Sequence, residues 1–292
     1  MNRKNRPKSP PGRQYGSWLA APMMLWAFLF VGVSLLYIIG LSFLQGDGAM
    51  GVHMTFTTEN YTRMAEPAYG RVLLNSLRLA GLTTLICLAA GYPFGYVMAN
   101  AKPLTQSILM LLLMVPFWTN ALIRLYGWRL FLAANGPMNT LLMNMGIIDQ
   151  PLSLLYNDFS VLLGMVYALL PFMILPSYTA VEKMDWSVVE ASRDLGANPA
   201  LAFLTVTLPL TFSGILAGCV LVFIPSVGLF FISDLLGGSK TPLAGNLIND
   251  AMKKSRDLPF AAALSVVLLS VTAVIIGLFR KTGGHAADLG IF

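Results

Sequence analysis

The chain has 292 residues, of which 56% are hydrophobic and 11% charged, with a formal net charge of +6 and a mean hydropathy of +0.70. Soluble domains carry about 25% charged residues, so this composition excludes a soluble globular protein and indicates an integral membrane protein surrounded by lipid. The basic residues are dispersed, which argues against nucleic acid as a partner and fits side chains that hold the cytoplasmic ends of membrane spans.

Six long intervals that are nearly free of charge predict six transmembrane helices. Each approaches or exceeds the roughly 20 residues that cross about 30 Å of hydrocarbon. The first is too long for the apolar region of a signal peptide and has no small-residue cleavage site after it, so we expect a retained helix. The predicted fold is an all-α membrane protein whose transmembrane domain covers 18–292, with spans at about 18–44, 72–98, 104–131, 159–181, 209–233 and 258–280.

Lysine and arginine residues predict the orientation of these spans. Residues 1–17 form a basic, proline-rich tail that we expect to be disordered and cytoplasmic. With this tail inside, ten basic residues flank the spans on the cytoplasmic side and six on the external side. The positive-inside rule is contradicted by one external cluster of basic residues, Lys253, Lys254 and Arg256. The first helix usually decides the orientation despite such a cluster. Both termini and the 182–208 loop are then predicted to be cytoplasmic.

Few side chains in this sequence suit metal binding or catalysis. Cys87 and Cys219 both lie inside apolar runs, where small packing residues are expected rather than a disulfide or a metal site. His53 and His285 are isolated and provide neither metal ligands nor a nucleophile–base set. The predicted span interiors contain no Asp or Glu, which counts against a stand-alone secondary transporter or channel driven by ion coupling.

The third predicted span is the most polar. Pro116 predicts a kink, and Asn120 and Arg124 are expected on one helical face. Arg124 either pairs inside the bundle or snorkels toward the external interface. Trp118 and Tyr126 belong either to an interfacial aromatic belt or to the lining of a pathway.

Glycine and proline mark the second and fourth spans. Gly81, Gly91 and Gly95 are expected to permit close approach of a neighbouring helix. Pro171 and Pro176 predict an interrupted fourth helix, of the kind that flanks moving or lining elements.

The end of the fifth predicted span combines aromatic and acidic side chains. A helical period would place Val227, Phe230, Phe231 and Asp234 on one face near the external mouth. A carboxylate beside ring faces can bind a cation by charge pairing and cation–π contact. The alternative is that Asp234 caps the loop and the phenylalanines face lipid.

The loop at 182–208 is the one long polar segment between two spans. Ser187 as N-cap and Glu190 three residues later match a capping box, and Glu190 can pair with Arg193 on the same helix. Asn198 and Pro199 then end the helix, which predicts a helix–turn–helix hairpin.

The same loop resembles the EAA loop of ABC-type importer permeases, in which Glu-Ala-Ala is followed at fixed spacing by Gly, Ile and Leu-Pro. Ser192 replaces the second Ala and Val206 replaces the Ile, two changes that keep side-chain size roughly constant. In that family the loop is a short cytoplasmic helix that docks into a cleft of a separate ATPase subunit. The resemblance implies coupling roles for a set of six residues: Glu190, Ala191, Ser192, Gly196, Leu208 and Pro209.

Four strings, PFWTNALIRLYG, LLPFMILP, VEASRDLGA and GLFFISDLLGG, resemble in this order the B-type permease of spermidine/putrescine ABC importers. The resemblance spans about residues 18–280 and implies the six-helix type I importer fold in a bacterial inner membrane. It also implies a homologous second permease, two ATPase subunits that bind the ATP and Mg²⁺, an external polyamine-binding protein, and alternating access for polyamines. The pathway or gate residues it favours are Phe230, Phe231 and Asp234, with Trp118, Asn120 and Tyr126 as further candidates.

The chain lacks the G-x-x-x-x-G-K-[ST] phosphate-binding loop, so we expect no ATPase site, no cofactor and no enzymatic activity in it. A permease for another solute, such as iron or a phosphonate, is the nearest alternative and predicts that Asp234 is dispensable.

Overall fold

A computed structural model describes residues 22–47, 51–238 and 240–281. The predicted tail at 1–17, the start of the first span and His285 lie outside these residues. Four described helices are long and apolar enough to cross a membrane, and two sharply bent helix pairs bring the count of candidate spans to six. The all-α, six-span prediction is therefore confirmed, apart from one short hairpin of β1 (Leu44–Gly46) and β2 (Val52–Phe56).

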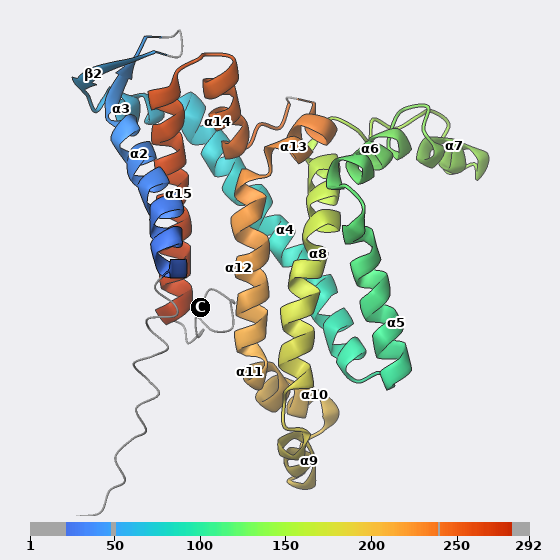
Figure 1. The fold of residues 1–292 in the computed structure, drawn as a ribbon. Coiled ribbons are helices and arrows are strands. Elements are labelled where there is room, and N and C mark those ends of the chain that lie inside the picture. Colours follow the sequence, from blue (N-terminus) through green and yellow to red (C-terminus); the bar gives the residue numbers. More distant parts are fainter. Residues whose placement is uncertain (1–21, 48–50, 239, 282–292) are drawn as a thin grey trace, which may run out of the picture.

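Three long helices form the core of the bundle: α4 (Pro67–Ala99), α8 (Asp158–Glu182) and α12 (Phe212–Gly228), which pack against one another (Figure 1). Glycines allow these helices to approach one another closely, which confirms the prediction for Gly91 and Gly95. A Cβ on Gly91 would lie 2.8 Å from Met173 Cγ, and one on Gly95 would lie 3.0 Å from the backbone nitrogen of Tyr178. Gly81 meets no such neighbour.

The fourth span is one continuous helix, so the predicted interruption is wrong. Pro171 and Pro176 both lie inside α8. Pro171 is buried in this helix, which packs against both α4 and α12. Tertiary packing of this kind can offset the hydrogen bond that each proline removes.

The third predicted span is two helices at 92°, rather than one kinked helix. α5 (Pro103–Met114) runs into a 3₁₀ turn at Val115–Trp118, and α6 (Ala121–Phe131) starts after an extended residue, Asn120. The Asn120 side chain accepts a hydrogen bond from the Leu122 backbone at 2.8 Å. Asn120 is therefore an N-cap that lies outside the helix carrying Arg124, and not a face partner of Arg124.

The fifth predicted span also breaks. Helix α12 begins at Phe212, after a 64° bend that separates it from the preceding loop helices, and it ends at Gly228. Leu229, at φ −73° and ψ 64°, separates α12 from α13 (Phe230–Ile232) and a π-helical turn at Ser233–Gly237. The single helical face predicted for Val227, Phe230, Phe231 and Asp234 does not exist.

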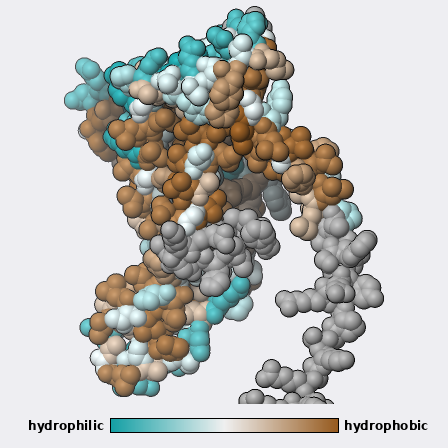
Figure 2. All heavy atoms as spheres, turned by 90° about the vertical axis from the view of Figure 1, so that its left-hand side faces the viewer, coloured by the Kyte–Doolittle hydropathy of each residue, from teal (hydrophilic) through white to brown (hydrophobic). Residues whose placement is uncertain are grey.

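The first span, Pro22–Ser42, includes a π-helical turn and α2 (Val33–Ser42), and it packs along α15 (Leu258–Lys281). Together they form a pair beside the core (Figure 1). Seen from this side, a broad hydrophobic band lies below a hydrophilic cap (Figure 2). None of the most apolar part of the first span is buried, so lipid or another subunit must cover it.

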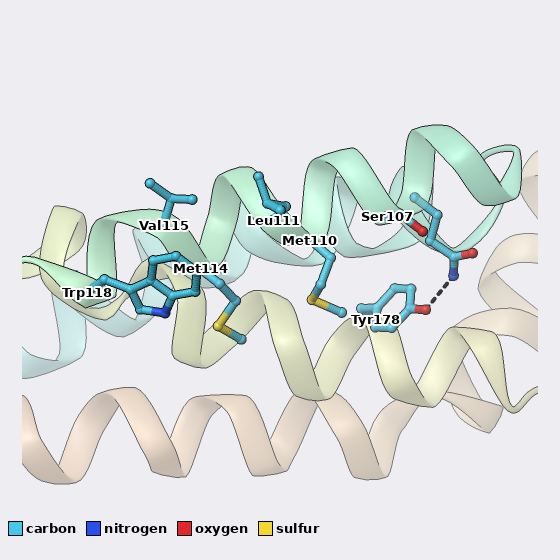
Figure 3. Close-up of a pocket in the computed structure, with 8 residues that line it drawn as sticks. Ser107, Met110, Leu111, Met114, Val115, Trp118 and Tyr178 are labelled. Carbon is cyan, nitrogen blue, oxygen red and sulfur yellow. Dashed lines mark hydrogen bonds between the residues drawn. The ribbon is translucent and has the colours of Figure 1, made fainter.

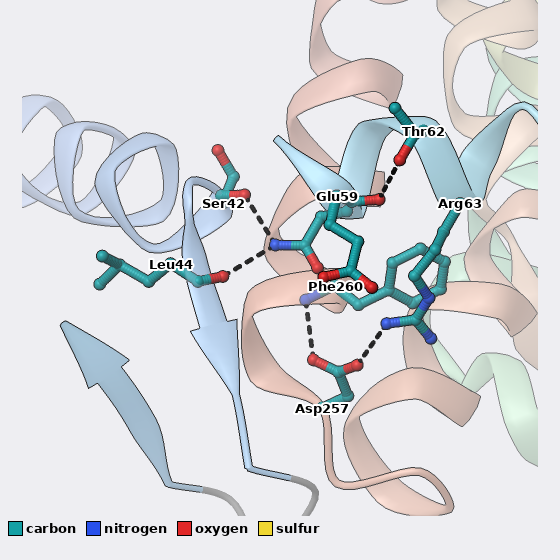
Figure 4. A network of polar contacts seen from close by, with 8 residues as sticks. Ser42, Leu44, Glu59, Thr62, Arg63, Asp257 and Phe260 are labelled. Carbon is teal, nitrogen blue, oxygen red and sulfur yellow. Dashed lines mark hydrogen bonds and ion pairs between the residues drawn. The ribbon is translucent and has the colours of Figure 1, made fainter. Parts of the chain in front are cut away.

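The corner of the molecule beside the β-hairpin is held by polar contacts between α3 (Glu59–Met64), the β1 strand and the start of α15 (Figure 4). Arg63 Nη1 lies 2.9 Å from Asp257 Oδ2, and its guanidinium stacks 4.2 Å from the Phe260 ring centroid. Asp257 Oδ1 also accepts from the Phe260 backbone at 3.1 Å, which caps α15. One carboxylate therefore joins two segments that are far apart in the sequence.

Asp257→Ala should lower the stability of the purified protein by about 2 kcal/mol, because it removes both the cap and the ion pair. Asp250→Ala is the matched control, since it removes only an exposed pair with Lys254 on one helix. Thermal unfolding can be followed with a thiol-reactive dye that reports exposure of Cys87 and Cys219, the free thiols of the helix core. Equal unfolding temperatures for the two variants would contradict this role of Asp257.

Candidate functional site: a projecting hairpin and a plug at the opposite end

A compact helical hairpin projects from the end of the bundle where α8 and α12 meet (Figure 1). It consists of α9 (Trp186–Asp194), a turn, α10 (Pro199–Ala202), a π-helical turn at Phe203–Thr207 and α11 (Leu208–Leu210). Asn198 Oδ1 caps α10 by accepting from the Leu201 backbone at 2.8 Å. The predicted helix–turn–helix is confirmed.

The cap of α9 is Asp185, whose Oδ1 accepts from the Ser187 backbone at 3.0 Å, so the predicted capping box with Ser187 as N-cap is wrong. Hydrogen bonds from the side chain and the backbone of Ser187 lower the pKa of Asp185. The ionised cap therefore stabilises α9 above the ordinary pKa of an aspartate, and this contribution is lost only as the pH falls through the lowered value. The predicted Glu190–Arg193 ion pair is absent from the described residues.

Gly196 ends α9 in a Schellman motif. Its φ of +93° is left-handed, its N–H donates to the Arg193 carbonyl at 2.9 Å, and the Ala197 N–H donates to the Ser192 carbonyl at 3.1 Å. This pair of bonds satisfies the last carbonyls of the helix and requires a residue that tolerates positive φ. The Schellman turn thus explains why a glycine stands at position 196 of the motif.

Gly196→Ala should loosen the hairpin by about 1–2 kcal/mol, the cost of a left-handed residue that carries a Cβ. Gly70→Ala is the matched control: neither glycine has an atom within 4 Å of an added Cβ, but only Gly196 has positive φ. Hydrogen exchange of amides 186–198 should accelerate on the order of tenfold in Gly196→Ala alone. Unchanged exchange would mean that the turn does not hold α9.

The hairpin has its own small core and an exposed outer face. Val189 is buried with Met184 and Ala202, whereas Glu190 and Ala191 are exposed and Ser192 is half-buried. Leu195 is 91% exposed at the tip. The outer face of the hairpin therefore presents exposed apolar and acidic side chains, Leu195 and Glu190.

Aromatic side chains fasten this hairpin to the bundle. Tyr96, near the end of α4, lies 6.2 Å from Trp186 and 5.7 Å from Phe203 between ring centroids. Tyr92 lies 6.1 Å from Phe203 and its hydroxyl bonds Thr211 Oγ1 at 2.9 Å, at the bend before α12. Sequence reasoning missed these residues, because rings from separate segments meet only in the folded chain. These contacts join α9 and the π-helical turn to α4 and to the bend before α12.

Leu208 and Pro209 lie in α11, just before that bend. Leu208 packs into the same aromatic cluster, and Pro209 is exposed. All six residues matched to the loop motif therefore belong to one hairpin, and the predicted fifth span starts three residues later than expected.

At the opposite end of the bundle (Figure 1), residues 228–238 and 240–246 form what we call the plug. Phe230 and Phe231 are in edge-to-face contact with centroids 6.2 Å apart. Asp234 is exposed, and its Oδ1 accepts from Asn246 Nδ2 at 2.6 Å. The same Nδ2 lies 3.3 Å from the Phe230 carbonyl, so Asn246 fixes the carboxylate relative to the rings.

The plug is bonded to the core helices by hydroxyl groups. Ser160 Oγ of α8 donates to the Leu236 carbonyl at 2.8 Å, and Ser76 Oγ of α4 accepts from the Ala244 N–H at 2.8 Å. Thr241 Oγ1 donates to Asp158 Oδ1 at 2.9 Å. Movement of α4 or α8 would therefore displace the carboxylate of Asp234.

The remaining candidates flank the bend between α5 and α6. Trp118, 83% exposed, lines one end of a groove of about 470 Å³ along α5, and Tyr178 lines it further along (Figure 3). Gln106 Nε2 bonds the Tyr178 hydroxyl and, at 3.1 Å, Glu182 Oε1, which joins α5 to α8. Asn120 is occupied as a cap and Tyr126 is 49% exposed. No contact described here brings these three residues to Asp234.

Comparison with known proteins decides the family. Residues 91–280 match the profile of the binding-protein-dependent transport system inner membrane components. The chain belongs to this family. It is therefore a multi-pass permease subunit of an inner-membrane ABC importer, and not itself an enzyme. The chain is 45% identical to the spermidine/putrescine transport system permease protein PotB of Haemophilus influenzae over 256 residues, 88% of this chain and 90% of that one. PotB of Escherichia coli K12 is 46% identical over 251 residues, 86% of this chain and 91% of that one.

Solved structures support the fold at lower identity. A chain of a bacterial alginate ABC transporter, in complex with an alginate-bound periplasmic protein, superposes with a TM-score of 0.74 at 15% identity, covering 94% of this permease and 98% of that chain. A chain of the inward-facing MetNI methionine ABC transporter gives 0.56 at 15% identity, covering 75% and 97%. The type I importer permease fold is thus confirmed.

Proposed function

We propose that this chain is the permease subunit through which an ATP-driven importer takes up polyamines, spermidine or putrescine. The observation that carries the substrate class is the identity of 45–46% with two PotB permeases over almost the whole chain. A fixed carboxylate beside two phenylalanine rings at one end of the bundle has the chemistry that a polyamine requires.

In this proposal the chain pairs with a homologous second permease, two ATPase subunits and an external polyamine-binding protein. The tail, both termini and the α9 hairpin are cytoplasmic, and the plug faces the binding protein. ATP and Mg²⁺ are held by the ATPase subunits, whose clefts receive Glu190, Ala191 and Leu195. The buried aromatic contacts between the hairpin and α4 support this assignment, because a docking element must be rigidly attached to what it moves.

The transport cycle then follows from these attachments. Closure of the ATPase dimer on ATP draws the two hairpins together, and the aromatic cluster transmits the movement to α4 and α12. Because α4 and α8 hold the plug through Ser76 and Ser160, the same movement displaces Phe230, Phe231 and Asp234 at the far end. ATP hydrolysis returns the bundle to its inward-open arrangement.

Uptake of radiolabelled putrescine and spermidine tests the substrate in a strain that lacks this permease and is complemented with it. Complementation should restore uptake, and unlabelled polyamine should compete whereas iron chelates and phosphonates should not. Restored uptake of iron or a phosphonate, without polyamine uptake, would overturn the proposal.

A further inference from the structure

Arg124 lies in α6, in the bent α5–α6 pair, and has no anionic partner among the described residues. Its Nε is buried and lacks a hydrogen bond, and no carboxylate of the described residues pairs with it. Its guanidinium lies 5.4 Å from the Phe117 ring centroid and 5.7 Å from that of Tyr167. The ring contacts orient the guanidinium but do not neutralise its charge.

The other arginines near this end of the bundle have partners. Arg78 pairs with Asp158 at 3.6 Å, and Arg129 donates to the Tyr156 hydroxyl at 3.1 Å. Asp158 also accepts from Thr241, so this carboxylate is already used twice. An anion that binds Arg124 would therefore come from outside the described residues.

The shape next to Arg124 indicates which anion fits. Arg124, Gly127, Trp128 and Phe131 share one face of α6 and line a cavity of about 290 Å³. Trp128 also lines an adjoining groove of about 340 Å³, whose other walls include Phe159, Leu163 and Val166 of α8. The cavity that contains Arg124 and the apolar groove thus share Trp128 as a wall.

The groove runs along α8. Its walls extend from Phe159 to Tyr167 of α8, which corresponds to about 12 Å at the helical rise. This length and lining suit part of an acyl chain. A free inorganic phosphate would leave the groove empty, and a polyamine would be repelled by the uncompensated arginine.

We propose that Arg124 and this groove bind a phospholipid, with the phosphate on the guanidinium and an acyl chain between α6 and α8. Planar guanidinium groups bind phosphate oxygens through two parallel hydrogen bonds, which would satisfy the buried Nε. The placement of this lipid in the external leaflet rests on the proposed orientation, whereas the binding of a lipid does not. The site would brace the bend on which α6 depends.

Native mass spectrometry of the intact importer tests this proposal by counting retained phospholipids. Arg124→Gln, which removes the charge, should reduce retention roughly tenfold, the factor for one lost hydrogen bond to a charged group. Val166→Trp, which fills the groove, should also reduce retention. Arg71→Gln is the matched control, since Arg71 is exposed and donates only to a carbonyl of its own helix. Unaltered retention in both groove variants would overturn the proposal.

A photo-crosslinking residue in place of Leu163 separates lipid from protein as the occupant. An adduct with the mass of a phospholipid supports the site if it disappears when Arg124→Gln is introduced into the same crosslinking protein. An adduct with the second permease would overturn it and would show that a subunit fills the groove. Both readouts are independent of transport, so a wrong substrate assignment leaves the test intact.

Discussion

Glu190→Lys should abolish transport by separating the permease from its ATPase. Glu190 is exposed on α9, forms no ion pair in the described chain, and stands on the outer face of a hairpin whose inner face is packed by Val189. Reversing a charge at a desolvated contact leaves its counterpart unpaired, which costs about 2–5 kcal/mol. Association with the ATPase should therefore weaken on the order of 30-fold or more.

The measurement is co-purification of the ATPase with the permease, alongside substrate-stimulated ATP hydrolysis in membranes. Asp149→Lys is the matched control, because it makes the same charge change at an exposed loop residue that lies outside the hairpin. Glu190→Gln separates contact from folding, since it removes the charge and leaves the Asp185 cap intact. If Glu190→Lys retains the ATPase as fully as Asp149→Lys does, α9 is not the coupling element.

The sequence predicted the uninterrupted spans well because charged residues mark their ends. The fourth was expected at 159–181 and runs Asp158–Glu182, and the sixth was expected at 258–280 and runs Leu258–Lys281. Hydropathy does not record the direction of a helix axis, however, so it could not reveal the bends of 92° and 64°. Asn120 was the available signal for the first bend, since it is a preferred N-cap residue and follows a proline turn.

For the hairpin, the sequence indicated a capped helix but the wrong cap. Asp185 and Ser187 are both good N-cap residues, and the choice of Asp185 depends on where α8 ends. Gly196 was assigned by resemblance, and the Schellman turn explains it. The anchoring rings of Tyr96, Trp186 and Phe203 come from three segments, so only tertiary structure could bring them together.

At the plug, the helical period of the sequence predicted that Asp234 and Phe230 share one face of the fifth helix. That helix, α12, ends at Gly228, before both residues. The two are related instead through Asn246, which lies 12 residues beyond Asp234 and bonds both. Gly245 permits this approach, because a Cβ there would lie 2.3 Å from the Gly228 carbonyl oxygen. A pattern within one helix could not anticipate an acid that is positioned by a second helix.

Asp234→Asn should raise the concentration of polyamine needed for half-maximal uptake by roughly ten- to a hundredfold, the range for losing one interaction with a charged group. The amide keeps the size of the side chain and can still bond Asn246 after rotation, so the plug should remain folded. Asn246→Ala should give a smaller loss, because the charge remains but its position is no longer fixed. Radiolabelled uptake, with binding-protein concentration held constant, measures both effects.

Asp250→Asn is the matched control, since Asp250 is an acid on α14 (Ala244–Lys253) that pairs only with Lys254 of the same segment. ATP hydrolysis in the absence of substrate should be equal in all three variants, because none touches the hairpin. If Asp234→Asn takes up polyamine like Asp250→Asn, the carboxylate is dispensable, and the cation must be recognised by groups of the second permease or the binding protein. A loss confined to Asp234→Asn and Asn246→Ala would instead identify the plug as the place where the polyamine charge is first met within this subunit.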